Sequence, residues 1–120
     1  MGARIFSDHL CLILPPLGSR EGISNPIVRI KFFTRDADWA WYVTEGSPED
    51  DDFLFFGFVF GFEQEWGNFS LSELAELRGP FGFPIERDLL FQPDSFSRIM
   101  ARENRWNTAW TAGNLQIGSF

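Results

Sequence analysis

Hydrophobic and polar side chains alternate in two segments of the first half of the chain, residues 27–33 and 39–45. A two-residue period is typical of a β-strand, whose successive side chains point to opposite faces of a sheet. In the first segment the apolar and basic positions separate as Val28, Ile30, Phe32 and Arg29, Lys31. In the second segment the two faces carry Trp39, Trp41, Val43 and Ala40, Tyr42, Thr44. Both segments are therefore predicted to be strands.

A third predicted strand, residues 53–62, is apolar at nearly every position (FLFFGFVFGF). Such continuity is typical of a strand that is buried on both faces, so we expect it to be the central strand of the sheet. Gly57 and Gly61 predict a bulge or the close approach of another element. Residues 63–69 are expected to pair back onto this strand, residues 85–91 to form a further strand, and the acidic residues 46–52 to form a turn or loop.

Short helices are predicted at three places by their start and stop signals: residues 7–14, residues 70–77, and residues 94 or 95 to about 102. Ser70 and Glu73 have the spacing of a capping box. In the last helix Phe96, Ile99 and Met100 are expected to face inward. Hairpin-connected strands followed by helices favour an α+β fold, with a small antiparallel sheet of about four or five strands and two or three short helices packed on it.

The composition supports a single folded domain over residues 1–120, because 44% of the residues are hydrophobic and 15 of them are phenylalanine. Cys11 is the only cysteine and His9 the only histidine, so neither a disulfide nor a histidine–cysteine metal site is expected. The apolar residues 10–14 are too few to span a membrane. We expect a cytoplasmic protein with no cofactor, no bound metal and no membrane contact.

Acidic residues are concentrated in the middle of the chain. The net charge is −7, and residues 36–77 contain eleven acids and neither lysine nor arginine. This distribution argues against direct nucleic-acid binding, which relies on basic residues, and favours a protein partner with a basic surface. The candidate partner-binding residues are Glu49, Asp50, Asp51 and Asp52, with Trp106 and Trp110 as apolar anchors.

Two other groups of residues suggest different chemistry. Glu86 and Asp88 would share one face of a strand and could hold Mg²⁺ or act as acid and base in a metal-dependent hydrolase or nuclease. They could equally form surface ion pairs, with Arg78 or Arg29 as partner. Separately, Arg98, Arg102 and Arg105 recur at helical spacing, which would suit a nucleic-acid-binding regulator.

Several sequence blocks follow one another in the order of a known family: residues 31–34 (KFFT), 39–45 (WAWYVTE), 55–57 (FFG), 69–74 (FSLSEL), 78–80 (RGP) and 84–89 (PIERDL). With these blocks the chain resembles the domain-of-unknown-function 2958 family over about residues 12–93. The resemblance implies a protein of bacterial plasmids, integrative elements or phages, and it supplies no catalytic residues. Residues 94–120 would then be a C-terminal helix followed by a tryptophan-containing extension.

Charge and resemblance together predict a non-enzymatic accessory protein of a mobile genetic element or phage that binds another protein. Its most concrete form is an anti-defence inhibitor of a host nuclease, of the anti-restriction or anti-CRISPR type. The hydrolase using Glu86 and Asp88 and the nucleic-acid-binding regulator are the alternatives. The sequence leaves open whether the protein is a monomer or a homodimer.

Overall fold

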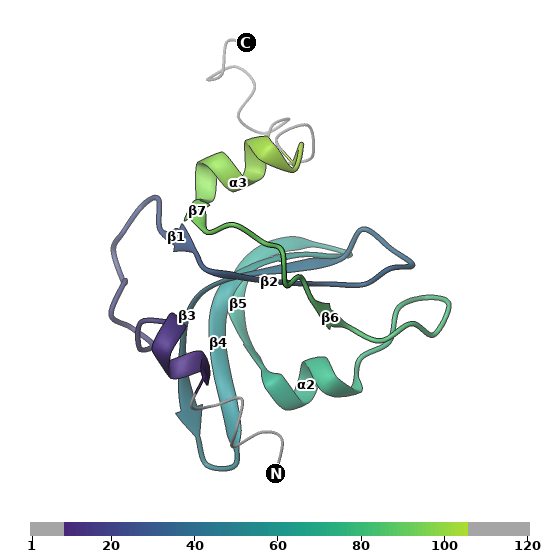
Figure 1. The fold of residues 1–120 in the computed structure, drawn as a ribbon, viewed down its shortest axis with the longest axis horizontal. Helices are drawn as coiled ribbons and strands as arrows, with labels where there is room; N and C mark the ends of the chain where they lie inside the picture. Colours follow the sequence, from purple (N-terminus) through teal and green to yellow (C-terminus); the bar gives the residue numbers. More distant parts are fainter. Residues whose placement is uncertain (1–8, 106–120) are drawn as a thin grey trace.

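A five-stranded antiparallel sheet forms the centre of the fold in the computed structural model, which describes residues 9–105 (Figure 1). The strands lie in the order β5–β4–β3–β2–β6. Their bounds are β2 Ile30–Phe33, β3 Ala40–Glu49, β4 Asp52–Phe60, β5 Gln64–Ser70 and β6 Glu86–Arg87. Two short strands, β1 (Ile27–Val28) and β7 (Asp94–Ser95), pair separately. The predicted α+β class with a small antiparallel sheet is confirmed.

Helices cover both faces of the sheet. Residues 9–13 are helical, and helix α2 spans Leu71–Glu76. Both lie on one side of the sheet, whereas helix α3, Phe96–Arg102, lies on the other (Figure 1). Two separate hydrophobic clusters result. The first contains Leu10, Leu14, Ile30, Phe32, Trp41, Val43, Phe53, Phe55, Phe69 and Leu74. The second contains Val28, Ala40, Tyr42, Phe58, Phe96, Ile99 and Met100.

Strand β3 divides its side chains between these two clusters as its sequence predicts. Trp41 and Val43 pack in the first cluster, and Ala40 and Tyr42 pack in the second. All four residues are buried. Because neither face of β3 meets water along this stretch, the strand requires a cover of apolar side chains on each side.

The predicted face of Val28 is wrong. In a straight strand Val28 and Ile30 would share a face, but Val28 packs in the second cluster and Ile30 in the first. The strand is interrupted at Arg29, whose backbone N–H donates to the Val43 carbonyl at 2.8 Å. This break lets β1 turn away from the main sheet and pair with β7 beside α3.

Strands β3 and β4 approach each other closely at Gly57, as predicted for that glycine. A Cβ atom at Gly57 would lie 2.0 Å from the Tyr42 carbonyl oxygen. A bulge lies opposite, because Val43 pairs with Gly57 and Glu45 pairs with Phe56, leaving Thr44 as the extra residue. Gly61 differs from the prediction, since its Cβ would make only an ordinary contact, at 3.9 Å from Trp39.

Two predicted boundaries are wrong. Residues 46–52 are not a loop, because β3 and β4 remain paired out to Glu49 and Asp52. The packing of Phe53 and Leu14 against Gly46 continues the first cluster along this part of the hairpin. Residues 85–91 are not a full strand, because only Glu86–Arg87 pair with β2 before the chain turns at Asp88.

The predicted helices are confirmed where the structure describes them, and so is the capping box of α2, whereas Ser95 stands at the N-cap of α3 without a side-chain capping bond. The Ser70 hydroxyl accepts from the Glu73 N–H at 3.1 Å, and the Glu73 carboxylate accepts from the Ser70 N–H at 2.7 Å. This reciprocal pair is the predicted capping box of α2. In α3, Phe96, Ile99 and Met100 are buried as predicted. The start of the helix that ends at Ile13 lies outside the described residues.

The closeness of Gly57 to Tyr42 predicts that Gly57→Ala lowers the free energy of unfolding by at least about 2 kcal/mol, because the contacted atom is backbone and cannot rotate away. Gly67 is the matched control: it pairs directly with Gly57, and a Cβ there would meet nothing within 4 Å. Gly67→Ala should change stability by less than about 1 kcal/mol. Chemical denaturation of both variants checks this, and equal stabilities would contradict the close approach.

Candidate functional site

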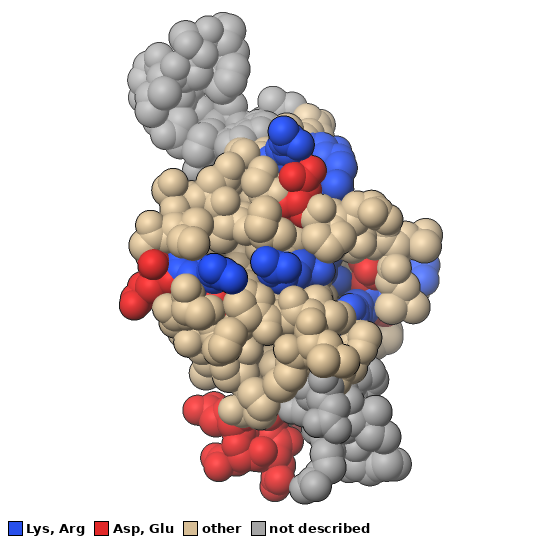
Figure 2. All heavy atoms as spheres, turned by 60° about the vertical axis from the view of Figure 1, so that its left-hand side comes forward, with Lys and Arg blue, Asp and Glu red and all other residues tan. Residues whose placement is uncertain are grey.

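The tip of the β3–β4 hairpin carries three neighbouring exposed acids, Glu49, Asp50 and Asp51. Asp50 has a left-handed backbone conformation (φ 56°), which closes the turn tightly. Within residues 9–105 none of these three side chains has a hydrogen bond or an ion pair. Figure 2 shows the acids gathered at the lower end of the molecule, beyond a tan, uncharged region. We call Glu49, Asp50 and Asp51 the acidic tip.

Asp52, the fourth acid predicted to bind a partner, differs from the other three because its side chain is hydrogen-bonded within the protein. Its Oδ1 accepts from the N–H groups of Phe53, at 2.8 Å, and Ser72, at 3.0 Å. Its Oδ2 accepts from the Ser72 hydroxyl at 2.5 Å. These bonds, chiefly that from the Ser72 hydroxyl, hold the pKa of Asp52 below its usual range. Asp52 therefore ties the base of the tip to the first turn of α2. The tryptophans predicted as anchors, Trp106 and Trp110, lie outside the described residues.

Glu86 and Asp88, the alternative catalytic pair, are each engaged locally. Glu86 receives two hydrogen bonds from Arg35, at 2.5 Å to Oε2 and 3.1 Å to Oε1. Asp88 Oδ1 accepts from the Leu90 N–H at 3.0 Å and shapes a turn. Among residues 9–105, no cluster of three or more histidine, cysteine or acidic side chains suits a metal ion. The ion pair that the sequence suggested for this face does form, but its base is Arg35.

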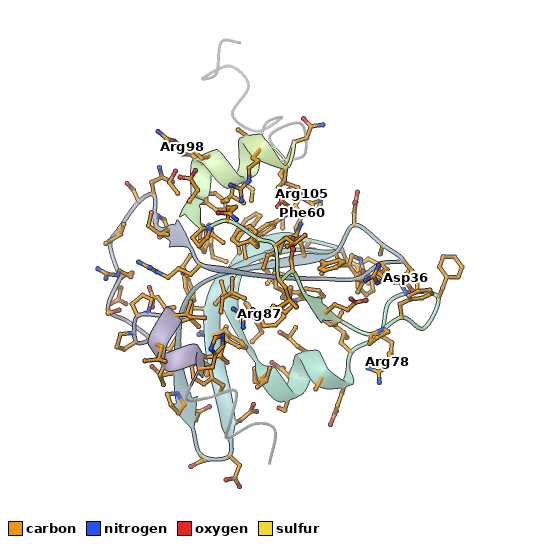
Figure 3. The ribbon with its side chains drawn as sticks, viewed as in Figure 1. Asp36, Phe60, Arg78, Arg87, Arg98 and Arg105 are labelled. Atoms are coloured by element: carbon orange, nitrogen blue, oxygen red, sulfur yellow. The ribbon has the colours of Figure 1, made fainter. Side chains whose placement is uncertain are left out.

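The three arginines predicted to line one helix do not form a row. Helix α3 ends at Arg102, and Asn104 takes the left-handed conformation (φ 61°) that turns the chain back. Arg98 extends outward near Asp94, whereas Arg105 folds inward over the Phe60 ring, 3.9 Å from its centroid (Figure 3). A continuous basic helix face is therefore absent from the described part of the chain.

A partly buried polar network around the buried Tyr42 joins β2, β3 and the end of α3, and sequence reasoning missed it. Glu103 Oε1 accepts from the Tyr42 hydroxyl at 2.6 Å and from Lys31 Nζ at 2.8 Å. Arg105 Nε donates to the same hydroxyl at 3.0 Å. Burial, followed by the bond to Glu103, raises the pKa of Tyr42 well above its ordinary value. The one available signal was the alternation that places Lys31 and Tyr42 on adjacent strands. We infer that this network holds the end of α3 against the sheet.

Other acids of the middle segment also have structural roles. Asp36 Oδ2 accepts from the N–H groups of Phe81, at 2.8 Å, and Phe83, at 3.2 Å. The same carboxylate lies directly against Gly79, so it fixes the loop after α2. In Figure 3 Asp36 lies at the end of the sheet beside the loop that follows α2, and Arg78 points outward nearby. Within residues 9–105 only the acidic tip places three exposed, unpaired acids at consecutive positions. The other exposed, unpaired acids of the middle segment are Asp38, Glu63, Glu65 and Glu76.

These features define a small α+β protein whose antiparallel sheet is covered on both faces and whose hairpin ends in acids that have no partner among residues 9–105. The chain belongs to the family described as "Protein of unknown function (DUF2958)", whose model matches residues 19–107. The resemblance seen in the sequence is confirmed, and the matched region continues through α3. No curated protein and no solved structure matches the chain. Within residues 9–105, no helix has the length and apolar character needed to cross a membrane.

The bonds of Asp52 predict that Asp52→Ala destabilises the protein by about 1 kcal/mol at neutral pH, because α2 loses an acceptor for its first turn. Since the folded-state pKa is lowered from 3.8, this contribution is present above pH 3.8 and is lost as the pH falls through the folded-state value. Asp51→Ala is the control and should leave stability unchanged. Urea denaturation across the acid range measures both, and equal effects of the two substitutions would contradict the role of Asp52.

The raised pKa of Tyr42 predicts that the protein loses stability at alkaline pH. Its pKa is raised from 10.0, so its contribution is complete below pH 10 and falls as the pH rises above that value. Because Tyr42 is the only tyrosine, phenolate absorbance reports this site alone. We expect the absorbance to rise only together with unfolding, and Tyr42→Phe to make the alkaline decline less steep. Phenolate formation near pH 10 in a protein that stays folded would contradict the partly buried network.

Proposed function

We propose that this protein is a non-enzymatic binding protein that presents the acidic tip, Glu49, Asp50 and Asp51, to a basic surface of another protein. The observation that carries the proposal is the exposure of three adjacent carboxylates, none paired within residues 9–105, at the projecting end of a hairpin. Such an array attracts positive charge over several ångströms and speeds the encounter with a basic partner.

The rigidity of the hairpin supports this proposal. Strands β3 and β4 pair continuously to the pair Glu49 and Asp52, and Asp52 is bonded to α2 directly below the tip. Phe53, the next residue, is fully buried. A tip that is held in this way loses little conformational freedom on binding, so more of the interaction free energy appears as affinity.

The remaining surface also favours protein contacts. Several large apolar side chains are more than four-fifths exposed, namely Leu12, Phe62, Phe81, Leu89 and Leu90. Leu89 and Leu90 are adjacent in the sequence, and apolar side chains that group on a surface are typical of proteins that bury it against a partner. The carboxylate pair of the alternative enzyme, Glu86 and Asp88, receives less support because Arg35 and the Leu90 N–H already engage it.

The most concrete partner is a nuclease of a host defence system, of the restriction or CRISPR type. Nucleases bind the phosphates of nucleic acid through lysine and arginine, and carboxylates on a rigid tip can occupy the same positions. This role belongs to a protein of a mobile genetic element or phage that acts in the bacterial cytoplasm. Family membership supplies no competing catalytic assignment.

The proposal predicts that charge reversal of the acidic tip abolishes partner binding. In the test variant Glu49→Lys and Asp51→Lys are combined with Asp50→Asn, which tolerates the left-handed conformation. The matched control carries Glu63→Lys, Glu65→Lys and Asp38→Asn, which change the net charge equally at exposed positions. Each tagged protein is used to capture partners from a bacterial lysate at low and moderate salt.

We expect the parent protein and the control to retain one protein in stoichiometric amount, lost as salt rises, and the tip variant to retain none. The retained protein is then assayed for nuclease activity with and without the parent protein. Equal retention by the tip variant and the control would refute the assignment of the tip. Retention of a partner with no nuclease activity would refute the nuclease inhibitor while leaving the binding function in place.

A further inference from the structure

Two adjoining cavities, of about 300 Å³ and about 220 Å³, lie between the loop of residues 20–26 and the sheet. Both are lined by Arg20, Ile23, Pro26 and Thr44, so they form one continuous hollow, which we call the loop–sheet groove. Its size falls in the range of small-molecule binding sites. The groove shares no residue with the acidic tip.

The loop that forms one wall of the groove is fixed to β3. The Leu17 N–H donates to the Ser47 hydroxyl at 2.9 Å, and the Gly18 N–H donates to Glu45 Oε1 at 2.7 Å. Further along, backbone turns close between Gly18 and Glu21 and between Arg20 and Ile23. The wall that carries Arg20 is therefore ordered before any ligand enters.

Two arginines line the groove, and the carboxylate of Glu21 also lines the larger cavity. Arg20 lines both cavities and Arg29 lines the smaller one. Neither guanidinium has a hydrogen bond or an ion pair within residues 9–105, and Arg29 Nε is buried without a partner. A buried donor without an acceptor is unfavourable, and an oxyanion would satisfy it through the planar fork of the guanidinium. In Figure 2 basic side chains form a row across the middle of the face on which this loop lies.

Aromatic side chains line the larger cavity and not the smaller one, which Arg29 lines. Trp66 and Phe56 line it together, with ring centroids 5.8 Å apart and planes 18° from parallel. Trp66 is 39% exposed. Its ring also contacts Phe58 and Phe96, which hold the indole in place. A partly exposed, immobilised indole offers a flat surface on which a heteroaromatic base can stack.

Glu45 gives the groove a direction. Its carboxylate is almost fully buried, at 5% exposure, and lines the cavity that also contains Arg20 and Trp66. Only Oε1 has a hydrogen-bond donor within residues 9–105, the Gly18 N–H. The free oxygen Oε2 can accept from a sugar hydroxyl or a base N–H, whereas it repels a phosphate. The carboxylate therefore directs an anionic group toward the arginines and a neutral ring toward Trp66.

We propose that the loop–sheet groove binds a nucleoside phosphate. The phosphate lies at Arg20 and Arg29, the sugar or base donates to Glu45, and the base stacks on Trp66. This site goes beyond the proposed protein-binding function, because it uses none of the residues of the acidic tip and its test needs no partner protein.

The test uses the full chain and isothermal titration calorimetry at low salt. Adenosine, guanosine, cytidine and uridine monophosphates are titrated separately, with inorganic phosphate and free adenosine as partial ligands. We expect at least one nucleoside monophosphate to bind at least about tenfold more tightly than either partial ligand, because only the complete molecule reaches both the arginines and Trp66. Phosphate binding as tight as that of every nucleotide, or no binding below about 1 mM, would overturn the proposal.

Arg20→Gln and Arg98→Gln form a matched pair, since both positions are exposed and each substitution removes one positive charge. We expect Arg20→Gln to weaken nucleotide binding by about tenfold or more, the effect of losing a charge-assisted hydrogen bond, and Arg98→Gln to leave it unchanged. Equal effects of the two substitutions would show that overall charge, and not the groove, causes binding. Thermal denaturation of both variants confirms that they remain folded.

Discussion

Strand β3 is buried on both of its faces, and the other elements of the fold are arranged around it. Residues 40–43 send their side chains alternately into two clusters, so the sheet needs an apolar cover on each side. Helix α2 and residues 9–13 cover one side, and α3 covers the other. The close contact of Gly57 with the Tyr42 backbone keeps β3 and β4 paired past the bulge. The same pairing carries the hairpin out to its acidic tip.

Net charge alone does not locate a binding surface in this protein, because several of its acidic residues have structural roles. Asp36 holds a loop, Asp52 anchors α2, and Glu73 completes a capping box. Each of these carboxylates accepts backbone N–H groups and is therefore committed to the fold. Glu49 and Asp51 lack such partners within residues 9–105 and can interact with another molecule. Other exposed acids of the segment also lack partners in this range, but only at the tip are three of them consecutive in the sequence.

Local sequence patterns predicted the local features well. The alternation around Trp41, the capping box at Ser70 and the close approach at Gly57 each depend on neighbouring residues or on the residue itself. The features that the sequence did not predict depend on residues that are far apart in the chain. Tyr42 and Glu103, for example, are 61 positions apart. Likewise, the groove brings together loop and strand residues that no motif relates. Such contacts arise only when the whole sheet has formed.

We propose that the acidic tip is the surface that meets the partner, a role that membership of a family of unknown function neither supplies nor opposes. Hydrogen–deuterium exchange of the complex with the captured partner tests it most directly, because it reads each backbone segment without altering any charge. We expect slower exchange in the turn between Glu49 and Asp52, and unchanged exchange around Glu63 in the β4–β5 turn. Unchanged exchange at the tip, with protection elsewhere on the chain, would contradict it.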